Sequence, residues 1–315
     1  MLEFTLRRLF GTVPVIFGIL AIAFVVLYLV PGDPAQTLAG PRASPEAIAR
    51  IAHEMGLDRP LHERFLSYLG RLAAGDLGRS AVSDKPVADS IVEKFPYTFK
   101  LTLMAMAFSV GIGLLAGILG AMYRGGVVDR LCTVFSVAGI SIPIFLFGLV
   151  FLYVLAGKMK WFPTSAYRVG DAWWPLVLPA FTLGVRSAAF LARIVRSSLI
   201  EVLNQDFIRT ARAKGVPPMR ILFRHALVNA LIPIITVIGL DLSSFLNGSV
   251  IVETIFDVPG LGRFAMDAIL QRDYPVIQGV VLFSAFIFVF VNFLLDLVYA
   301  WVNPRIRDEM FGAAG

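Results

Sequence analysis

Long apolar segments recur along the chain, and each is close to the length that a helix needs to cross a bilayer. A spanning helix takes about 20 mostly apolar residues. The segments occupy residues 9–30, 101–123, 131–156, 174–194, 226–251 and 276–302. Pro179 and Pro233 fall inside the fourth and fifth segments, where proline is expected to interrupt a helix. The pattern predicts an all-α integral membrane protein with about six transmembrane helices.

The first segment follows Arg7 and Arg8, much as the apolar core of a signal peptide follows its basic start. Its apolar stretch is longer than the roughly 7 to 15 residues of a signal peptide, and no small-x-small cleavage site follows it. We therefore expect this segment to remain in the mature protein as the first span.

The polar stretch between the first two segments has the pattern of two amphipathic helices rather than of disorder. Ser44 and Pro45 form a typical helix start, a capping hydroxyl followed by proline, and Gly56 is a typical stop. A second helix is expected from Pro60 to Gly75, with its apolar side chains on one face. These apolar faces need cover from the outer membrane surface, from a soluble partner or from the protein's own spans, and we favour the spans.

The composition is too apolar for an ordinary soluble protein. The chain is 57% hydrophobic and 16% charged, whereas soluble domains average about 25% charged residues. Its net charge of +6 lies beside the apolar segments, where basic residues set topology, so we do not expect a nucleic-acid partner. Cys132 is the single cysteine, so neither a disulfide framework nor a thiolate metal site is expected.

Basic residues in the short loops favour one side of the membrane. Under the positive-inside rule, this asymmetry predicts that both termini are cytoplasmic. The predicted inner basic residues are Arg7, Arg8, Arg124, Arg130, Arg193, Arg196, Arg209, Arg212, Lys214, Arg220, Arg224, Arg305 and Arg307. Those of the two short outer loops are Lys158, Lys160, Arg168, Arg263 and Arg272.

The inner loop between the fourth and fifth segments predicts a short, stiff helix. Asp206 is a suitable N-cap, Gly215 is a suitable stop, and two prolines that follow prevent its continuation. One side of this helix is small and the other is basic, while Phe207 and Ile208 supply apolar knobs. Such a helix can insert into a groove of a partner protein or lie on anionic lipid, and its chemistry alone favours neither.

Several motifs extend this pattern along the whole chain. The inner loop contains Arg209-Thr-Ala-Arg-Ala-Lys-Gly215, followed by His225 and then by Asn229-Ala230-x-x-Pro233. The other motifs are Pro31-Gly-Asp-Pro34, Gly56-Leu-Asp-Arg-Pro60, Gly75-Asp-Leu-Gly78, Ile140-Ser-Ile-Pro143, Glu253-x-x-Phe256, Pro259-Gly-Leu-Gly262, Arg272-Asp-Tyr-Pro275 and Asn303-Pro-Arg305. In their joint order and spacing they resemble importer-type ABC permeases, specifically the dipeptide/oligopeptide/nickel branch.

Two features depart from the generic signature of those permeases. The generic signature opens with Glu-Ala-Ala, whereas this chain has Arg209-Thr210-Ala211. The distance from Gly215 to Pro233 is also longer than in the generic signature. Both departures are similar to the peptide branch, and no contact is carried over from the generic glutamate.

The resemblance implies an importer-type ABC permease fold and a set of partners. They are a second, homologous permease subunit, two cytoplasmic ATPase subunits and an extracytoplasmic substrate-binding protein, assembled in a lipid bilayer. The chain contains no Gly-x-x-x-x-Gly-Lys-Ser/Thr phosphate loop, so ATP and Mg are expected on the ATPase subunits and no cofactor on this chain. No catalytic residue and no metal ligand are therefore predicted here.

Two loops are the predicted partner contacts. The inner loop is predicted to couple to an ATPase subunit through Asp206, Phe207, Ile208, Arg209, Thr210, Ala211, Arg212, Ala213, Lys214 and Gly215. The last outer loop is rich in Pro and Gly yet carries large apolar residues, which is unfavourable for an exposed loop without a partner. It is predicted to lie over the path and meet the binding protein or its cargo, through Glu253, Phe256, Pro259, Gly260, Leu261, Gly262, Arg263 and Asp273.

Two features inside the spans also carry predictions. Arg186 and Asp241 lie at similar depth, so they either form a structural ion pair, which we favour, or line the translocation path. Gly113, Gly117 and Ala121 recur at a spacing of four, which predicts a close helix–helix contact with an unidentified helix.

The predicted organisation has four parts. They are the cytoplasmic N-terminus with the first span (1–31), a folded helical extracytoplasmic loop (32–96), a five-span permease core (97–303) with its coupling loop (197–225), and a cytoplasmic tail (304–315). The predicted function is a permease subunit, in a bacterial or archaeal inner membrane, of an ATP-driven importer of di- or oligopeptides. The alternatives are import of glutathione or of a nickel chelate and, in a different class, a secondary transporter or channel; an intramembrane protease is disfavoured because none of the three histidines lies in a span.

Overall fold

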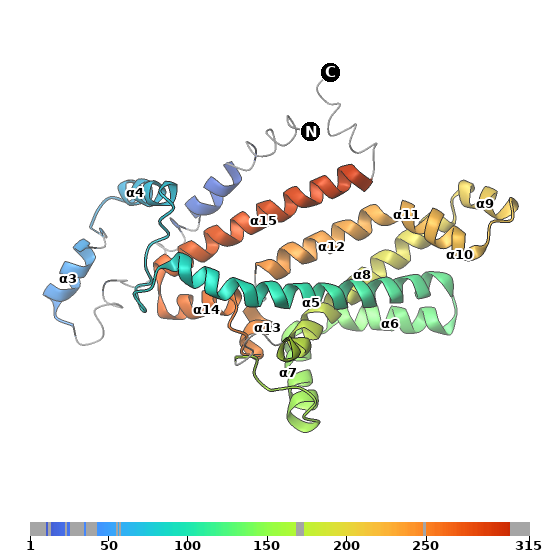
Figure 1. Cartoon of the computed structure of the whole chain (residues 1–315), viewed down its shortest axis with the longest axis horizontal. Helices are drawn as coiled ribbons and strands as arrows, with labels where there is room; N and C mark the ends of the chain where they lie inside the picture. Colours follow the sequence, from blue (N-terminus) through green and yellow to red (C-terminus); the bar gives the residue numbers. More distant parts are fainter. Residues whose placement is uncertain are drawn as a thin grey trace, which may run out of the picture. The chain divides into compact units, whose positions relative to one another are not determined.

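The computed structural model describes residues 11, 14–22, 24–25, 35, 43–54, 56, 58–167, 173–247 and 250–302. The described residues are mostly helical, and the single isolated β-bridge among them joins Arg79 to Pro86. The predicted all-α fold is confirmed (Figure 1).

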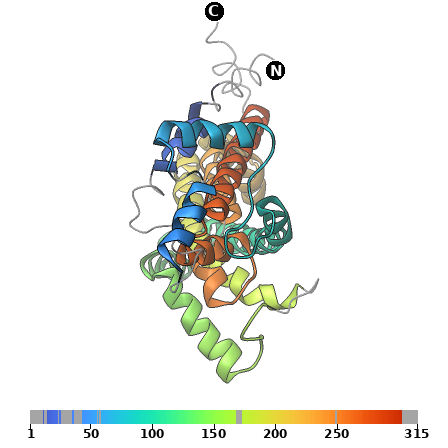
Figure 2. The ribbon, with the colours of Figure 1, turned by 90° about the vertical axis from the view of Figure 1, so that its left-hand side faces the viewer.

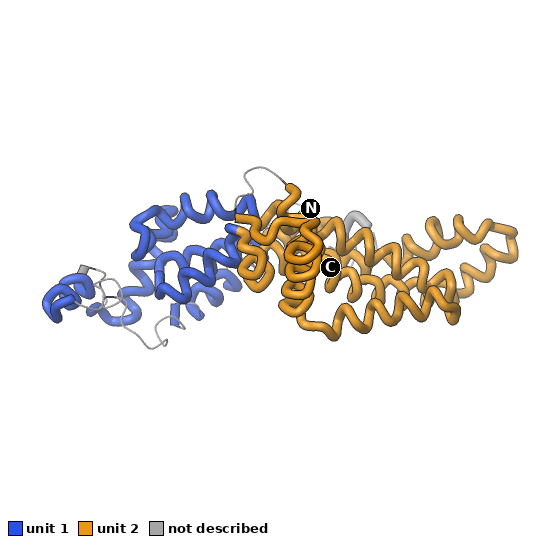
Figure 3. The backbone as a smooth tube through the Cα atoms, turned by 90° about the horizontal axis from the view of Figure 1, so that it is seen from below, with its two compact units in different colours: residues 1–97, 259–289 blue, residues 98–258, 290–315 orange. Residues whose placement is uncertain are grey.

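The chain divides into two compact units, which Figure 3 shows in blue and orange: residues 1–97 with 259–289, and residues 98–258 with 290–315. The first unit contains α3 (Pro45–Glu54), α4 (Leu61–Ala73), α14 (Leu261–Gln271), the start of α5 (Val87–Met122) and most of α15 (Tyr274–Val302). The second contains the rest of α5 and α15 together with α6 (Val127–Ser141), α7 (Ile144–Phe151), η1 (Leu152–Lys158), η2 (Trp174–Leu176), α8 (Val177–Leu203), α9 (Asp206–Ala213), α10 (Pro218–Arg220), η3 (Ile221–Ala226), α11 (Leu227–Asn229), α12 (Leu231–Leu246) and α13 (Val250–Ile255).

Three helical segments of the described chain are long and apolar enough to cross a membrane: α5, η2 with α8, and α15. Two further candidates are bent pairs, α6 with α7–η1, bent by 102°, and α10–α11 with α12, bent by 61°. If each pair counts as one span, the described residues provide up to five. The predicted first span, 9–30, lies largely outside the described residues.

The predicted effects of proline are partly wrong. Pro179 does not interrupt its span, because it is the third residue of α8 and its missing amide is one that a helix start leaves unpaired. The third predicted span, by contrast, is broken before Pro143, the N-cap of α7.

The predicted boundary at residue 97 falls inside α5, which begins at Val87 and carries Pro96.

In the first unit, the two outer-loop helices form as predicted (Figure 2). The hydroxyl of Ser44 accepts a hydrogen bond from the Ala47 amide at 3.3 Å, so Ser44 caps α3. The buried ring of Tyr68 on α4 packs in one cluster with Leu20 and Phe24 of the first segment, and this burial raises the pKa of Tyr68 to about 12. The prediction that the protein's own spans cover this loop is confirmed for α4.

In the second unit, α8 is the central helix, since it packs against α6, α7, α12 and α13. A Cβ added at Gly113 of α5 would lie 2.9 Å from Leu191 of α8, and one added at Gly117 would lie 2.5 Å from Val195. Real Cβ atoms do not approach this closely, so glycine allows the two helices to touch. The predicted small-residue contact is confirmed, and its partner is α8.

Candidate functional site

The predicted inner-loop helix is α9, and it ends where the sequence predicts. Gly215 adopts a φ of 75°, a left-handed conformation that is strained for any residue with a Cβ. The amides of Gly215 and Val216 donate to the carbonyls of Arg212 and Ala211 at 2.9 and 3.2 Å, which closes the helix end.

The start of α9 differs from the prediction by one residue. Gln205 is the extended N-cap residue, with no side-chain capping bond, and Asp206 is the first helical residue. The prediction of Asp206 as N-cap is therefore wrong. Its carboxylate instead accepts a hydrogen bond from the guanidinium of Arg209 at 3.1 Å and lies beside the positive end of the helix dipole.

Nearly all of α9 is exposed, because a single side chain anchors it. Ile208 is fully buried where α9 packs against η3, so its prediction as an outward apolar knob is wrong. Phe207 remains 46% exposed. The other outward residues are Asp206, Arg209, Thr210, Arg212, Ala213, Lys214 and Gly215, while Ala211 is half-buried.

Two residues that the sequence analysis did not single out enlarge this surface. Met219 of α10 and Phe223 of η3 are 55% and 47% exposed. Each lies directly before a basic residue, Arg220 or Arg224, and the two are spaced as on one helix face. This pattern could have predicted them from the sequence. The inner loop thus presents large apolar side chains among basic ones, a surface suited to a partner with an apolar groove and acidic rim.

In the last outer loop, unlike in α9, the first predicted contact residues are buried. Glu253 lies in α13 with no exposed surface, and the hydroxyl of Thr98 on α5 donates to its carboxylate at 3.0 Å. The ring of Phe256 is 1% exposed, and its backbone carbonyl accepts a hydrogen bond from the Ala166 amide at 2.8 Å. Both side chains support the second unit from inside.

The predicted contact residues that follow, in the first unit, are also buried or half-buried. Leu261 is 1% exposed and packs in one cluster with Val87, Ile91 and Val276. Gly260, Gly262 and Asp273 are buried, and Pro259 and Arg263 are half-buried. Phe256 and Leu261 are therefore internal, whereas Met266, Ile269 and Leu270 of α14 are 38%, 55% and 71% exposed. Contact of this loop with a partner stays a prediction.

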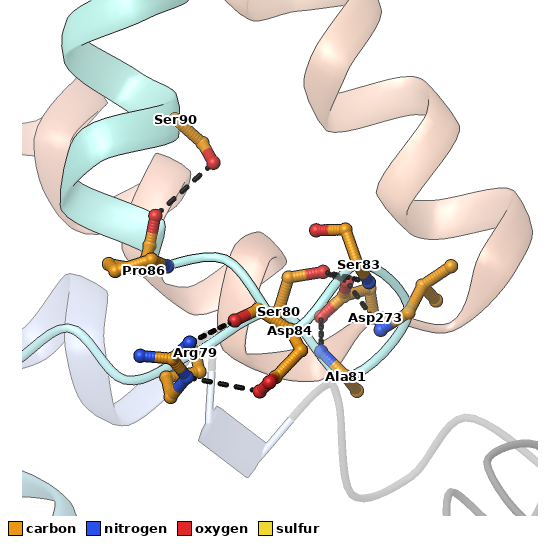
Figure 4. Close-up of polar contacts among 9 residues, drawn as sticks. Arg79, Ser80, Ala81, Ser83, Asp84, Pro86, Ser90 and Asp273 are labelled. Atoms are coloured by element: carbon orange, nitrogen blue, oxygen red, sulfur yellow. Dashed lines mark hydrogen bonds and ion pairs between the residues drawn. The ribbon is translucent and has the colours of Figure 1, made fainter.

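Asp273 holds two segments of the first unit together (Figure 4). The hydroxyl of Ser80 donates to its carboxylate at 2.5 Å, and the amide of Ala81 donates at 3.1 Å. The same carboxylate faces the amide of Val276 at 3.5 Å in the first turn of α15. Asp273 thus fixes the turn at residues 79–86 onto the start of α15. No local pattern in the sequence marks Ser80 as its partner.

Arg186 and Asp241 are not joined by an ion pair among the described residues. The carboxylate of Asp241 on α12 accepts hydrogen bonds from Ser187 at 2.9 Å and from Ser109 at 3.5 Å. The side chain of Arg186 is exposed, one residue along α8 from Ser187. The observed geometry therefore differs from the structural pair that we favoured.

The structure instead reveals an ion pair that sequence reasoning missed. The guanidinium of Arg196 on α8 binds the carboxylate of Asp129 on α6, at 2.5 and 2.9 Å. From the sequence, Arg196 was expected only to be one of the inner basic residues that set topology. In the described part of the chain, no group of three or more His, Cys, Asp or Glu side chains could hold a metal ion.

Comparison with protein families matches nearly the whole chain to two models. Residues 110–308 match the family described as binding-protein-dependent transport system inner membrane component. Residues 1–102 match the N-terminal part of the same kind of membrane component.

Curated relatives match over almost their full length. The glutathione transport system permease protein GsiC of Escherichia coli O6:H1 is 41% identical over 307 residues, which cover 98% of this chain and 99% of the relative. GsiC of Escherichia coli K12 and that of Shigella dysenteriae are each 40% identical with the same coverage.

Among solved structures, an inward-facing form of the methionine ABC transporter MetNI has a similar fold. One of its chains matches with a TM-score of 0.56 at 20% identity, covering 68% of this chain and 96% of that chain. At this identity the likeness concerns the fold alone.

Proposed function

Because the chain belongs to the family of binding-protein-dependent transport system inner membrane components, we propose that it forms half of the translocation path of an ATP-driven importer whose cargo is glutathione. The chain is a permease subunit of an ABC importer. The observation that carries the proposed cargo is identity of 40–41% with glutathione permeases along 98% of the chain.

Glutathione was an alternative in the sequence analysis, behind di- and oligopeptides. The relatives favour it over that first reading, since their names specify glutathione transport. Glutathione is itself a small peptide, so the proposed cargo still belongs to the predicted substrate class of small peptides. A nickel chelate has no support from the relatives cited here.

Within this proposal, α9 is the coupling element and the chain itself performs no catalysis. ATP and Mg bind to two cytoplasmic ATPase subunits, which receive the exposed side chains of α9 together with Met219 and Phe223. A second permease completes the path, and an extracytoplasmic binding protein delivers the cargo. Both termini then lie in the cytoplasm, because the positive-inside rule places α9 on that side.

The cargo is tested with the complete complex in proteoliposomes that contain its own binding protein. We expect ATP-dependent uptake of radiolabelled glutathione that unlabelled dipeptides and longer peptides compete with only weakly. A non-hydrolysable ATP analogue provides the control and should abolish uptake. Efficient dipeptide uptake without glutathione uptake would refute the proposed cargo.

The coupling role is tested with Ala211→Trp. Ala211 is half-buried on a helix that is otherwise exposed, so the larger ring changes the docking surface of α9 while the spans still insert. We expect the ATPase subunits to copurify poorly, or ATP hydrolysis to proceed without uptake. The matched control is Ala49→Trp, which adds the same bulk to an exposed position of α3 and should leave ATPase binding unchanged. Wild-type uptake by Ala211→Trp would sink the assignment.

A further inference from the structure

One face of α8 is open, although α8 is the most buried of the three continuous candidate spans. Of the apolar stretch that makes this helix a candidate span, 72% is buried by other parts of the chain. The same share is 28% for α5 and 22% for α15. Five positions interrupt this burial at successive spacings of four, three, four and four residues, which places them on a single helix face. The exposed residues are Arg186, Phe190, Arg193, Ser197 and Glu201.

The other faces of α8 are occupied by its neighbours. Leu191 and Val195 meet the glycines of α5. Ala189 lies against Gly139 of α6, where an added Cβ would be 2.4 Å away, and Ser187 donates to Asp241 of α12. The open face of α8 therefore lies between its α6 side and its α12 side, and no other described part of the chain covers it.

In the described part of the chain, neither arginine on this face forms a hydrogen bond or a salt bridge with a carboxylate, although Arg186 lies close enough to Asp241 for their charges to interact. Asp241, the nearest candidate for Arg186, is held by two serines. Arg196, on the α6 side of the same helix, differs from these two arginines because it forms a salt bridge with the buried Asp129. Arg186 and Arg193 are separated by about 10 Å along the helix axis, at 1.5 Å per residue.

An unpaired arginine in the middle of a span, such as Arg186, is unfavourable against lipid, and Arg193 lies nearer the predicted inner end of the same span. Charged groups in spans face a water-filled cavity or the interior of the assembly, where they mark the route of ions or substrates. Glutathione carries more carboxylates than amines, and a guanidinium binds a carboxylate through two parallel hydrogen bonds. The charge of this face thus complements that of the proposed cargo.

We infer that the open face of α8 lines the translocation path, and that Arg186 and Arg193 bind the carboxylates of an anionic cargo as it passes. The inference rests on the proposed function for the identity of that cargo. It assigns Arg186 to the path instead of to a structural pair with Asp241. The exposed ring of Phe190 lies between the two arginines and supplies the apolar wall of the site.

Water access to this face is tested by cysteine labelling in the complete complex, on a Cys132→Ala background. Phe190→Cys and Ser197→Cys should react with a charged methanethiosulfonate, and glutathione with its binding protein and ATP should slow the reaction at position 190. Ala188→Cys is the matched control, since Ala188 is fully buried on the opposite face of α8 and should not react. Absence of labelling in the intact complex, or labelling only after the second permease has dissociated, would overturn the inference.

The role of charge is tested with Arg186→Gln and Arg186→Lys. We measure uptake of glutathione and of its glycine monoethyl ester, each at saturation of the binding protein. Arg186→Gln should lower glutathione uptake about tenfold or more, as expected for loss of a hydrogen bond to a charged group, and should lower uptake of the ester less. Arg186→Lys should restore part of the activity, because it keeps the charge but lacks the two parallel donors of the guanidinium. An equal loss for both cargoes, or no loss, would refute cargo binding by Arg186.

The two proposals fail in different ways. If the wild-type complex does not transport glutathione while position 190 is still labelled from water, the cargo is wrong and the path assignment stands. If glutathione is transported and neither position 190 nor position 197 is labelled, the path assignment alone is wrong.

Discussion

The inner-loop helix α9 and the outer segment from Glu253 to Asp273 were both predicted as partner contacts. In the structure, α9 is mostly exposed, whereas the predicted contact residues of the outer segment are mostly buried. In α9, Ile208 is the single fully buried side chain, and nearly all others point outward. In the outer segment, Glu253, Phe256 and Asp273 are at most 3% exposed. Residues of a recognised motif can therefore be exposed in one place and form an internal support in another.

The difference has a simple physical origin. The eight residues of α9 include few large apolar side chains, so its burial can stabilise only one anchoring contact. The outer segment contains Phe256 and Leu261, whose exposure to water would be unfavourable. It also contains a buried carboxylate, which would be unfavourable without hydrogen bonds. These side chains therefore fold inward, while Met266, Ile269 and Leu270 of the same segment remain exposed.

Truncating one phenylalanine in each region should separate the two regions most clearly. Phe256→Ala should lower the free energy of unfolding by about 3–5 kcal/mol, because it leaves a cavity at a fully buried position. Phe207→Ala should change stability by no more than about 0.5 kcal/mol, while it weakens copurification of the ATPase subunits. Thermal unfolding in detergent measures the first effect. Equal melting temperatures for the two variants would contradict the comparison.

The next effect concerns the two aspartates of the outer segment. Asp273→Ala should lower the free energy of unfolding by about 2–3 kcal/mol, since Ser80 and Ala81 lose a charged, buried acceptor. Asp267→Ala is the matched control: its carboxylate lies 3.8 Å from Arg263 and is 52% exposed, so a loss below about 1 kcal/mol is expected. If Asp273 were instead a contact for the binding protein, its variant would melt like wild type and fail only in cargo delivery.

The smallest expected effect is at the stop of α9. Gly215→Ala forces a side chain into a left-handed conformation and should destabilise the end of α9 by about 1 kcal/mol. Amide hydrogen exchange should speed up in α9 and remain unchanged in the core of α8. Gly70→Ala, inside α4 with no atom within 4 Å of the added Cβ, should stabilise its helix by up to about 1 kcal/mol. The same sign for both substitutions would count against the role of Gly215.

Much of the helical framework could be predicted from the sequence. α3, α4, α9 and α15 begin or end within a few residues of their predicted limits. Local signals define such limits: the cap at Ser44, the glycine stops at Gly56, Gly75 and Gly215, and the length of the apolar runs. Prolines were harder to interpret, because the effect of Pro179 depends on where within α8 it falls.

The helical, apolar segments and the family motifs could be recognised from the order of the residues alone, because these properties depend on neighbouring residues. The pairing of charged groups could be seen only in the folded protein. Asp241 accepts hydrogen bonds from Ser187 and Ser109, Arg196 pairs with Asp129, and Arg186 is left exposed. These contacts depend on the rotation of each helix about its axis and on which helices pack beside it, and the local sequence pattern contains neither.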